Sequence, residues 1–259
     1  MKIHVNADRP NKHIPYWVIQ TLKKKGIYTD DPNADIIWNV DSIHNIGLVK
    51  GKVLTIYWEV DDFMALGRND KWYSETDLLY IVHEQYKRHY PEKVKVLGGA
   101  ADPDFHKDTN RKKEWDYVFV GSIEFLPVYY HRIQLIDYVM RNHPKTLVTY
   151  GSEEMYPDLM SSGRIILDVL PITERGSPCV HLRFYEAMAI GCLMVDYHPY
   201  LDSIAQKDVH YVTYDRLGDI TDDEIKRISK ASRELVVKNY TWDHRIDQVI
   251  EDVKQLLNQ

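Results

Sequence analysis

The fold is decided by one stretch, Ser177-Pro178-Cys179-Val180-His181-Leu182-Arg183-Phe184-Tyr185-Glu186-Ala187-Met188-Ala189-Ile190-Gly191-Cys192-Leu193-Met194-Val195-Asp196. Ser177 is a favourable N-cap, and Pro178 fits the first helical position, where a missing N–H costs nothing. Gly191 suits the left-handed position that ends a helix. The residues at 193–195 form a short apolar run that is typical of a buried parallel strand. The stretch therefore predicts a helix that passes directly into a strand.

Two charged residues, Arg183 and Glu186, lie inside this predicted helix. They are three positions apart and so share one face of the helix. Their neighbours are apolar, and a buried charge is costly unless a partner satisfies it. One interpretation is a structural ion pair at the edge of the helix, and the other is a ligand site.

The composition is that of an ordinary globular protein. The chain has 259 residues, 44% of them hydrophobic and 28% charged, and a formal net charge of −6. This length allows one large domain or two small ones, and the charge gives no basic excess for nonspecific nucleic-acid binding. The two cysteines, Cys179 and Cys192, have neither metal-ligand spacing nor a disulfide pattern. With no signal-peptide core and no apolar run near ~18 residues, we expect a soluble cytoplasmic protein without a membrane span.

Strands alternate with helices in two series, which predicts an α/β fold with two parallel sheets. The expected strands lie at 3–5, 35–40, 52–58, 78–82, 93–97, 117–120, 146–149, 165–170, 193–195 and 209–213. The expected helices lie at 14–25, 85–89, 128–141, 157–161, 178–190, 201–206, 222–239 and 242–257. The polar segment between the series gives the domain prediction: an N-terminal domain at 1–104, a linker at 105–114, a C-terminal domain at 115–241 and a final helix at 242–259.

The loops at the carboxyl ends of parallel strands meet at one edge of a sheet, where ligands bind. The loop at 171–176 enters the quoted helix, whose free first-turn amides and dipole predict an anion site. A second loop, after the strand at 117–120, offers another contact at the same edge. The predicted phosphate contacts are Gly121, Ser122, Arg132, Gly176, Ser177, Cys179 and Val180.

Glu186 then acquires a physical role. A carboxylate about two turns into a helix lies a sugar's length from phosphates bound at the helix start. It can accept hydrogen bonds from both hydroxyls of a ribose, which would satisfy its charge. Tyr150 and Gly151, which close a neighbouring strand, are predicted as a shelf for the base. These residues favour a nucleoside diphosphate site over the structural ion pair.

The stretch Arg183–Val195 resembles the R-x-x-E-A-x-A-x-G-x-x-x-V signature of group 1 glycosyltransferases with the GT-B fold. The chain is particularly similar to the CgeB/YkvP-like branch of these enzymes. Three further stretches fit that branch, namely Gly99-Ala100-Ala101-Asp102-Pro103, Tyr117-Val118-Phe119-Val120-Gly121-Ser122 and Asn239-Tyr240-Thr241-Trp242-Asp243-His244-Arg245.

The resemblance implies two Rossmann-like domains that face each other across a cleft, with the last helix crossing back to the N-terminal domain. It implies a nucleotide-sugar donor, expected to be a UDP-hexose such as UDP-glucose, and no metal or other cofactor. Glu186 would hold the ribose, and Arg183 the pyrophosphate or the donor sugar. Many group 1 enzymes also carry the E-x7-E pattern, but Pro178 occupies its first position and Glu174 is the nearest acidic residue. A retaining transfer is expected, and this departure leaves the outcome open.

An inverting enzyme would need a base on the N-terminal side of the cleft. The candidates at predicted strand ends are Asp8, Glu59, Asp61, Asp62 and His83, of which Asp61 and His83 are the two singled out. The acceptor is left open among a glycan, a protein, a small molecule and a modified nucleic acid, and so is an oligomeric state.

Three alternatives stand beside this hypothesis. Asp102-Pro103-Asp104 matches the DxD metal motif of GT-A glycosyltransferases, although Pro103 and the polar segment after it favour a hinge that Asp102 pins. A noncatalytic module with the same fold would bind a nucleotide sugar or a partner without turnover. A phage-type DNA base glycosyltransferase would require local binding to DNA despite the acidic balance of the chain.

Overall fold

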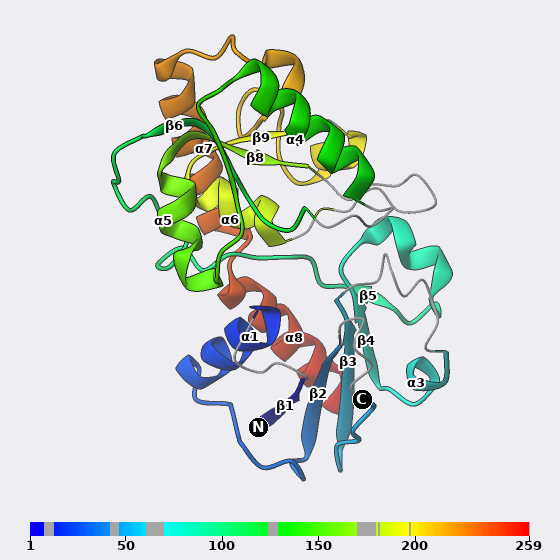
Figure 1. The fold of residues 1–259 in the computed structure, drawn as a ribbon. Helices are drawn as coiled ribbons and strands as arrows, with labels where there is room; N and C mark the ends of the chain where they lie inside the picture. Colours follow the sequence, from blue (N-terminus) through cyan, green and yellow to red (C-terminus); the bar gives the residue numbers. More distant parts are fainter. Residues whose placement is uncertain are drawn as a thin grey trace. The chain divides into compact units, whose positions relative to one another are not determined.

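The computed structural model describes residues 1–7, 13–41, 47–60, 70–123, 129–169, 180, 182–196 and 198–258. The chain divides into two compact units, which Figure 1 shows as ribbons. Unit 1 comprises Met1–Gly98 and Trp242–Gln259, and unit 2 comprises Gly99–Thr241. Each unit has its own five-stranded sheet. Every strand pairing in both sheets is parallel, which confirms the predicted α/β fold with two Rossmann-like units.

The sheet of unit 1 follows the order of the chain. Its strands are β1 (Ile3–Asn6), β2 (Ile36–Asp41), β3 (Leu54–Glu59), β4 (Leu78–Ile81) and β5 (Lys95–Val96), and they lie side by side in this order. All side chains of β3 and β4 are buried. Continuous apolar runs of this kind form the centre of a parallel sheet because helices or loops cover both of its faces.

The helices of unit 1 come from its N-terminal segment and from the C-terminal end of the chain. They are α1 (His13–Lys24), α3 (Asp70–Ser74), the 3-10 helix η1 (Glu84–His89) and α8 (Trp242–Leu257). The buried residues of α8 form an apolar stripe at 242, 246, 249 and 253, which is the spacing of one helix face. The amino end of α8 lies beside the end of α1, where Lys25 pairs with Asp243 and Asp247 at 3.2 and 2.8 Å.

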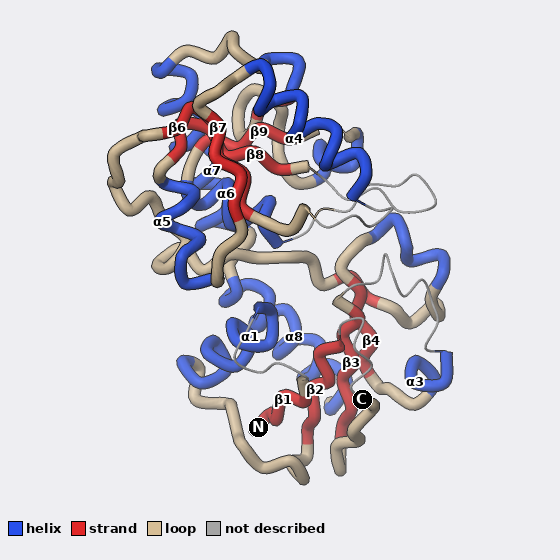
Figure 2. Tube along the Cα trace, in the orientation of Figure 1, coloured by secondary structure: helices blue, strands red, loops and turns tan. Residues whose placement is uncertain are grey.

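The sheet of unit 2 reverses its order. Its strands are β6 (Trp115–Val120), β7 (Thr146–Thr149), β8 (Gly163–Asp168), β9 (Cys192–Val195) and β10 (Val212–Thr213), arranged as β10-β9-β8-β6-β7. Figure 2 labels the first four of these strands. The chain moves from β6 outward to β7 and then returns to the other side of β6 with β8. The carboxyl ends of β6 and β8 therefore flank the topological switch point, where open α/β sheets bind ligands.

Helices cover both faces of this sheet. They are α4 (Tyr130–Asn142), α5 (Tyr156–Ser161), α6 (Leu182–Ile190) and α7 (Asp222–Asn239), together with the 3-10 helices η3 (Glu153–Met155), η4 (Pro199–Ser203) and η5 (Tyr214–Arg216). Val120 of β6 belongs to a core cluster with Met160 of α5 and Phe184 of α6. The preceding Phe119 belongs to a second cluster with Val139 of α4. Alternate side chains of a strand point to opposite faces, so the sheet is the middle of three layers.

The segment predicted as a linker, residues 105–114, is anchored to α5 of unit 2. The amide of Thr109 donates to Ser161 Oγ at 3.0 Å, and Lys113 Nζ donates to the Ser161 carbonyl at 2.8 Å. Arg111 also pairs with Asp158. The structure thus places these polar residues within unit 2, which begins at Gly99.

Helix α6 differs from its prediction at both ends. It begins at Leu182, and Val180 is not helical, so the predicted start at Pro178 is wrong. Val180 is instead a buried member of the core, 2% exposed. At the other end the Gly191 amide donates to the Ala187 carbonyl at 2.9 Å, and Gly191 is not among the glycines with positive φ, so its predicted left-handed conformation is wrong. Gly191 forms a bend between the two elements, and β9 begins at the next residue.

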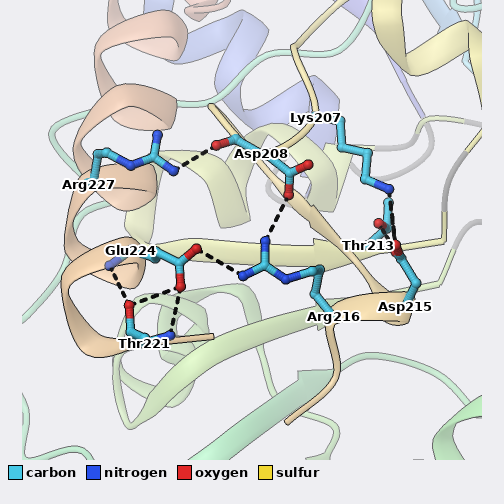
Figure 3. Close-up of polar contacts among 8 residues, drawn as sticks. All are labelled: Lys207, Asp208, Thr213, Asp215, Arg216, Thr221, Glu224 and Arg227. Carbon is cyan, nitrogen blue, oxygen red and sulfur yellow. Dashed lines mark hydrogen bonds and ion pairs between the residues drawn. The ribbon is translucent and has the colours of Figure 1, made fainter. Parts of the chain in front are cut away.

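A charged network fixes the start of α7 (Figure 3). Arg216 pairs with Asp208 at 3.4 Å and with Glu224 at 2.9 Å. Thr221 and Glu224 form a capping box in which each side chain accepts the other residue's backbone N–H. The Thr221 amide and Arg216 lower the pKa of Glu224 to about 2. Arg227 adds a bond of 2.8 Å to the Asp208 carbonyl, so the network joins α7 to the connection between β9 and β10.

None of the helices that the structure describes combines the length and the apolar character needed to cross a membrane.

Candidate functional site

Opposite charges meet at the switch point of unit 2. Asp168 is the last residue of β8 and is fully buried. Arg183 lies in the first turn of α6, and its Nη1 is 3.7 Å from Asp168 Oδ1. The strand and the helix each hold one charge, and the helix start adds its own positive end at the same place.

The guanidinium of Arg183 rests on the backbone of Gly121, directly after β6. A Cβ on Gly121 would lie 2.4 Å from Arg183 Nη2 and 2.6 Å from Nη1. The φ of Gly121 is 158°, which residues with a side chain rarely adopt. The guanidinium carbon also lies 5.4 Å from the centre of the Phe119 ring. Only glycine at position 121 therefore permits this close approach.

Arg183 keeps unfilled donors. Its side chain is 14% exposed, and its Nε and Nη1 are buried without a hydrogen-bond acceptor among the residues that the structure describes. A guanidinium carries five N–H donors, and a buried donor without an acceptor costs about 1–3 kcal/mol. This arrangement suits an anionic ligand with several oxygens, because such a ligand would supply the acceptors.

Arg132, predicted as a phosphate contact, is a buried link between two strand-end loops. Its Nε and Nη2 donate to the Val169 carbonyl at 3.2 and 3.0 Å, and its Nη1 donates to the Ser122 carbonyl at 3.1 Å. The side chain is 2% exposed, and burial and the neighbouring Arg183 lower its pKa. Three of the five N–H donors of Arg132 are thus used by these backbone carbonyls.

Asp168 lies among several ionisable groups. Burial raises the pKa of its carboxyl to about 6, against the opposing effect of Arg183 and Arg132 and with a smaller contribution from Asp196. Tyr214 Oη donates to the Asp168 carbonyl at 3.3 Å, and burial together with the charges of Asp196 and Asp168 raises the pKa of this phenol. The sequence analysis did not select Asp168 as a site residue. The signal in the sequence that could have identified Asp168 was its position as an acidic residue inside the apolar run at 165–170.

Glu186 has a different partner from Arg183. It lies in the second turn of α6, 7% exposed, and its Oε1 is 3.5 Å from Nε2 of the buried His106. Nδ1 of His106 lies 3.1 Å from the Asp102 amide nitrogen and 3.2 Å from the Asp102 carbonyl oxygen, and Nε2 faces Glu186. Arg183 pairs with Asp168 and Glu186 with His106, so the alternative of a structural Arg183–Glu186 ion pair is wrong.

The turn that carries His106 also contains the predicted DxD motif. Asp102 Oδ1 accepts from the amides of Asp104 and Phe105 at 2.9 and 3.0 Å. Arg233 of α7 donates to the carbonyls of Pro103 and His106 at 2.7 and 2.9 Å. Asp102 thus stabilises a turn, as the hinge interpretation expected. Among the described residues no group of three His, Cys, Asp or Glu side chains could hold a metal ion.

The remaining residues predicted to bind the donor are Tyr150, Gly151, Gly176, Ser177 and Cys179. Tyr150, which follows β7 at the same edge of the sheet, is 73% exposed. Gly151 packs closely, because a Cβ there would lie 2.8 Å from Leu159 Cδ1. Gly176, Ser177 and Cys179 lie outside the described residues, as does Glu174.

On unit 1, the described candidates for a base are buried. Glu59 ends β3 and accepts a hydrogen bond from Tyr73 Oη. His83 is 2% exposed, with its ring centre 5.6 Å from that of Tyr86. Asp8, Asp61 and Asp62 lie outside the described residues.

The two Rossmann-like units give the chain the GT-B fold, and solved structures of other proteins share this fold. HepE from Anabaena, in complex with UDP-glucose, gives a TM-score of 0.63 at 9% identity over 98% of this chain and 100% of that one. Sucrose-phosphate synthase from Thermosynechococcus elongatus gives 0.57 at 10% identity over 86% and 74%. TarM from S. aureus gives 0.59 at 11% identity over 93% of this chain and 58% of that one.

A sequence profile assigns the family. The profile described as "Glycosyl transferase-like" matches residues 104–251, and the chain belongs to this family. No curated protein sequence matches the chain significantly. The matched residues include the quoted stretch and every described residue of the site in unit 2. Membership of the CgeB/YkvP-like branch stays a prediction.

Proposed function

We propose that the protein is a metal-independent, retaining glycosyltransferase that moves a hexose from a UDP-sugar to an acceptor hydroxyl. The observation that carries the proposal is the Arg183 guanidinium, held over Gly121 with two buried N–H donors lacking an acceptor among the described residues. Family membership and the GT-B fold support glycosyl transfer from a nucleotide sugar as the activity class. Structures of HepE with UDP and with UDP-glucose support the choice of donor.

In this proposal Arg183 and the start of α6 bind the diphosphate of the donor. Charge develops on the leaving diphosphate during transfer, and preorganised positive groups stabilise it without reorganisation. Arg132 holds the two loops on either side of the switch point, so it positions the site through Ser122 and Val169. The further proposed phosphate contacts are Gly121, Ser122, Gly176, Ser177, Cys179 and Val180.

Glu186 is proposed to bind the ribose hydroxyls. It lies about one helical turn beyond Arg183, and its Oε1 is 3.5 Å from Nε2 of His106. Tyr150 is proposed to stack on the base, since most of its ring is exposed at the end of β7. Gly151 leaves the adjacent backbone close to α5 and so shapes this end of the site.

The acceptor is proposed only by class, as a hydroxyl on a glycan, a protein, a small molecule or a modified nucleic acid. A retaining transfer needs no separate base on the acceptor side. The alternative, an inverting transfer, would use His83 or Asp61 to take the proton of the acceptor hydroxyl.

A thermal-shift screen tests the donor. The protein is heated with UDP-, GDP-, ADP- and dTDP-sugars, and we expect UDP-glucose to raise its Tm most. Glu186→Ala should lose this stabilisation, whereas Glu234→Ala, a matched change on the exposed face of α7, should keep it. Equal stabilisation of the parent and Glu186→Ala contradicts the ribose assignment.

Turnover separates an enzyme from a binding module. We expect release of UDP from UDP-glucose at a similar rate with and without EDTA. Binding without release of UDP would assign a noncatalytic module, and loss of turnover in EDTA would overturn metal independence.

A further inference from the structure

Asp168 is the buried group that faces Arg183. Its carboxylate is fully buried at the end of β8, and Arg183 Nη1 approaches it to 3.7 Å. In the part of the chain that the structure describes, the other charged or titratable groups around it are Arg132 from α4, Asp196 after β9 and Tyr214 from η5. Two guanidinium groups and two carboxylates of the described residues therefore lie together here.

The position of this carboxylate is fixed by its surroundings. Strand β8 lies between β6 and β9 in the sheet, so its backbone has neighbours on both sides. Tyr214 donates to the Asp168 carbonyl, and Arg132 donates twice to the next carbonyl, that of Val169. Arg183, by contrast, is a long side chain on the first turn of a helix. Asp168 is the fixed partner of this pair and determines where the guanidinium rests.

We propose that Asp168 is the positioning residue of Arg183, and that its carboxylate takes up one proton from the solvent when the donor diphosphate binds to Arg183. The inference rests on the proposed function, since it requires a diphosphate at this place. No covalent bond to the donor is involved: a solvated proton is transferred to Asp168, which becomes a neutral carboxylic acid.

The reason is the crowding of negative charge. A bound diphosphate places a second anion on the guanidinium that Asp168 already faces. Like charges at such distances disfavour the ionised form of a carboxyl group, and they do so strongly where solvent is excluded. Burial has already raised the pKa of Asp168 to about 6, so a further rise of ~2 units carries it through neutral pH. The neutral acid then leaves Arg183 to the phosphate oxygens.

The sign of the pH dependence follows from linkage. The liganded state binds more protons than the free state between the two pKa values of Asp168, so affinity falls as pH rises through this window. Donor affinity should be about 25-fold lower at pH 8 than at pH 6, and it should level off below pH 6. His131, whose Nε2 is 3.7 Å from Asp196 Oδ2, is the nearby group that must be tested separately.

Calorimetry measures the proton directly. UDP-glucose is titrated at pH 7 in PIPES and in imidazole, whose ionisation enthalpies differ, because its doubly esterified diphosphate does not itself titrate there. The wild-type protein should take up about 0.5–1 proton per UDP-glucose bound. Asp168→Asn, which keeps the shape and removes the titration, should take up close to none and bind with an affinity independent of pH. Asp137→Asn, an exposed change on α4, and His131→Gln should behave like the wild type.

Two results overturn the proposal. One is binding of UDP-glucose to the wild type without proton uptake, and the other is unchanged uptake in Asp168→Asn. If Asp168→Asn does not fold, a wild-type series from pH 5 to pH 9 decides, because uptake must pass through a maximum near pH 7 and a flat profile excludes Asp168. Failure of the proposed function looks different: no nucleotide sugar of the panel would then bind at all.

Discussion

The polar side chains at the carboxyl edges of the two sheets differ in their hydrogen bonding. In unit 1, Glu59 accepts a hydrogen bond from Tyr73, and His83 packs against Tyr86. Glu59 and His83 are each 2% exposed. In unit 2, Nε and Nη1 of Arg183 are buried without an acceptor among the described residues. Native proteins seldom leave buried polar atoms unsatisfied, so the second edge has the character of a site that a ligand completes.

The strand orders explain the difference. Unit 1 runs β1-β2-β3-β4-β5 without a reversal, so its successive connections all leave in the same sense. Unit 2 runs β10-β9-β8-β6-β7, and the loops after β6 and β8 diverge from one point. Space for a ligand between loops arises at such a point.

A second comparison lies within unit 2. Arg216, near the edge strand β10, pairs with both Asp208 and Glu224 in the network of Figure 3. Arg183, at the switch point, has one ion pair of 3.7 Å. Both arginines belong to the same unit, and among the described residues Arg216 has two ion-pair partners whereas Arg183 has one, together with two buried nitrogens that lack an acceptor.

Replacement of Arg183 should produce the largest effect. Arg183→Ala removes the positive charge that faces the leaving diphosphate, and we expect kcat/KM to fall about 10²- to 10³-fold. Arg164→Ala is the matched control, because Arg164 lies at the start of β8, at the opposite edge, and pairs with Asp116 and Asp222. Its activity should stay within about twofold of the parent, as surface ion pairs contribute little. Equal losses in the two variants would remove the distinction between the two edges.

Gly121→Ala should have the next effect. The new methyl group would lie 2.4 Å from Arg183 Nη2, so the guanidinium must move away from its position. We expect donor affinity, measured by calorimetry, to fall about tenfold, in line with the loss of a charge-assisted hydrogen bond. Gly191→Ala tests the same change where a Cβ has ordinary contact, with Ile166 Cδ1 at 3.5 Å. Unchanged affinity in Gly121→Ala would show that the donor does not depend on the placement of Arg183.

The alternation of strands and helices predicted both parallel sheets because buried strands and amphipathic helices leave clear periodic patterns. Helix α8 lies where its pattern predicted it, at 242–257. The start of α6 was misplaced because Ser177 and Pro178 are good local signals for a helix start, whereas the burial of Val180 is a tertiary effect. Local capping chemistry does not reveal such an override.

At the site, the sequence identified Arg183 and Glu186 as a charged pair but could not assign their partners. Asp168 and His106 come from distant segments, and only the sheet order and the packed turn bring them to α6. Arg132 was predicted as a phosphate contact, and this role stays a prediction. The N–H groups of Arg132 donate to two backbone carbonyls because of the conformation of both loops. No residue spacing in the sequence encodes that conformation.

Glu224 tests the charged network at the start of α7 through a smaller, pH-dependent effect on stability. Its folded pKa of about 2 lies below the ordinary value of 4.5, so its contribution to stability is complete above the ordinary value and is lost as pH falls toward 2. Glu224→Gln should lower the Tm by about 2–4 °C at pH 7, and the gap should narrow below pH 4. Glu234→Gln, whose carboxylate is exposed and 3.9 Å from Lys230, is the control. A gap that stays constant with pH would mean that the charge of Glu224 does not stabilise α7.

His83 should give the smallest effect, and it tests the edge of unit 1. Under the proposed retaining transfer this buried residue has no proton to remove, so His83→Gln should keep kcat/KM within about threefold of the parent. A general base contributes about 10²–10⁴-fold. A loss of that size with unchanged UDP-glucose affinity would therefore assign His83 to the acceptor and overturn the retaining proposal. If affinity, turnover and Tm fell together, packing against Tyr86 would be the cause, and His83→Phe should then restore the Tm. The anomeric configuration of the product, read by NMR, gives an independent answer, because retention and inversion leave opposite stereochemistry at the transferred sugar.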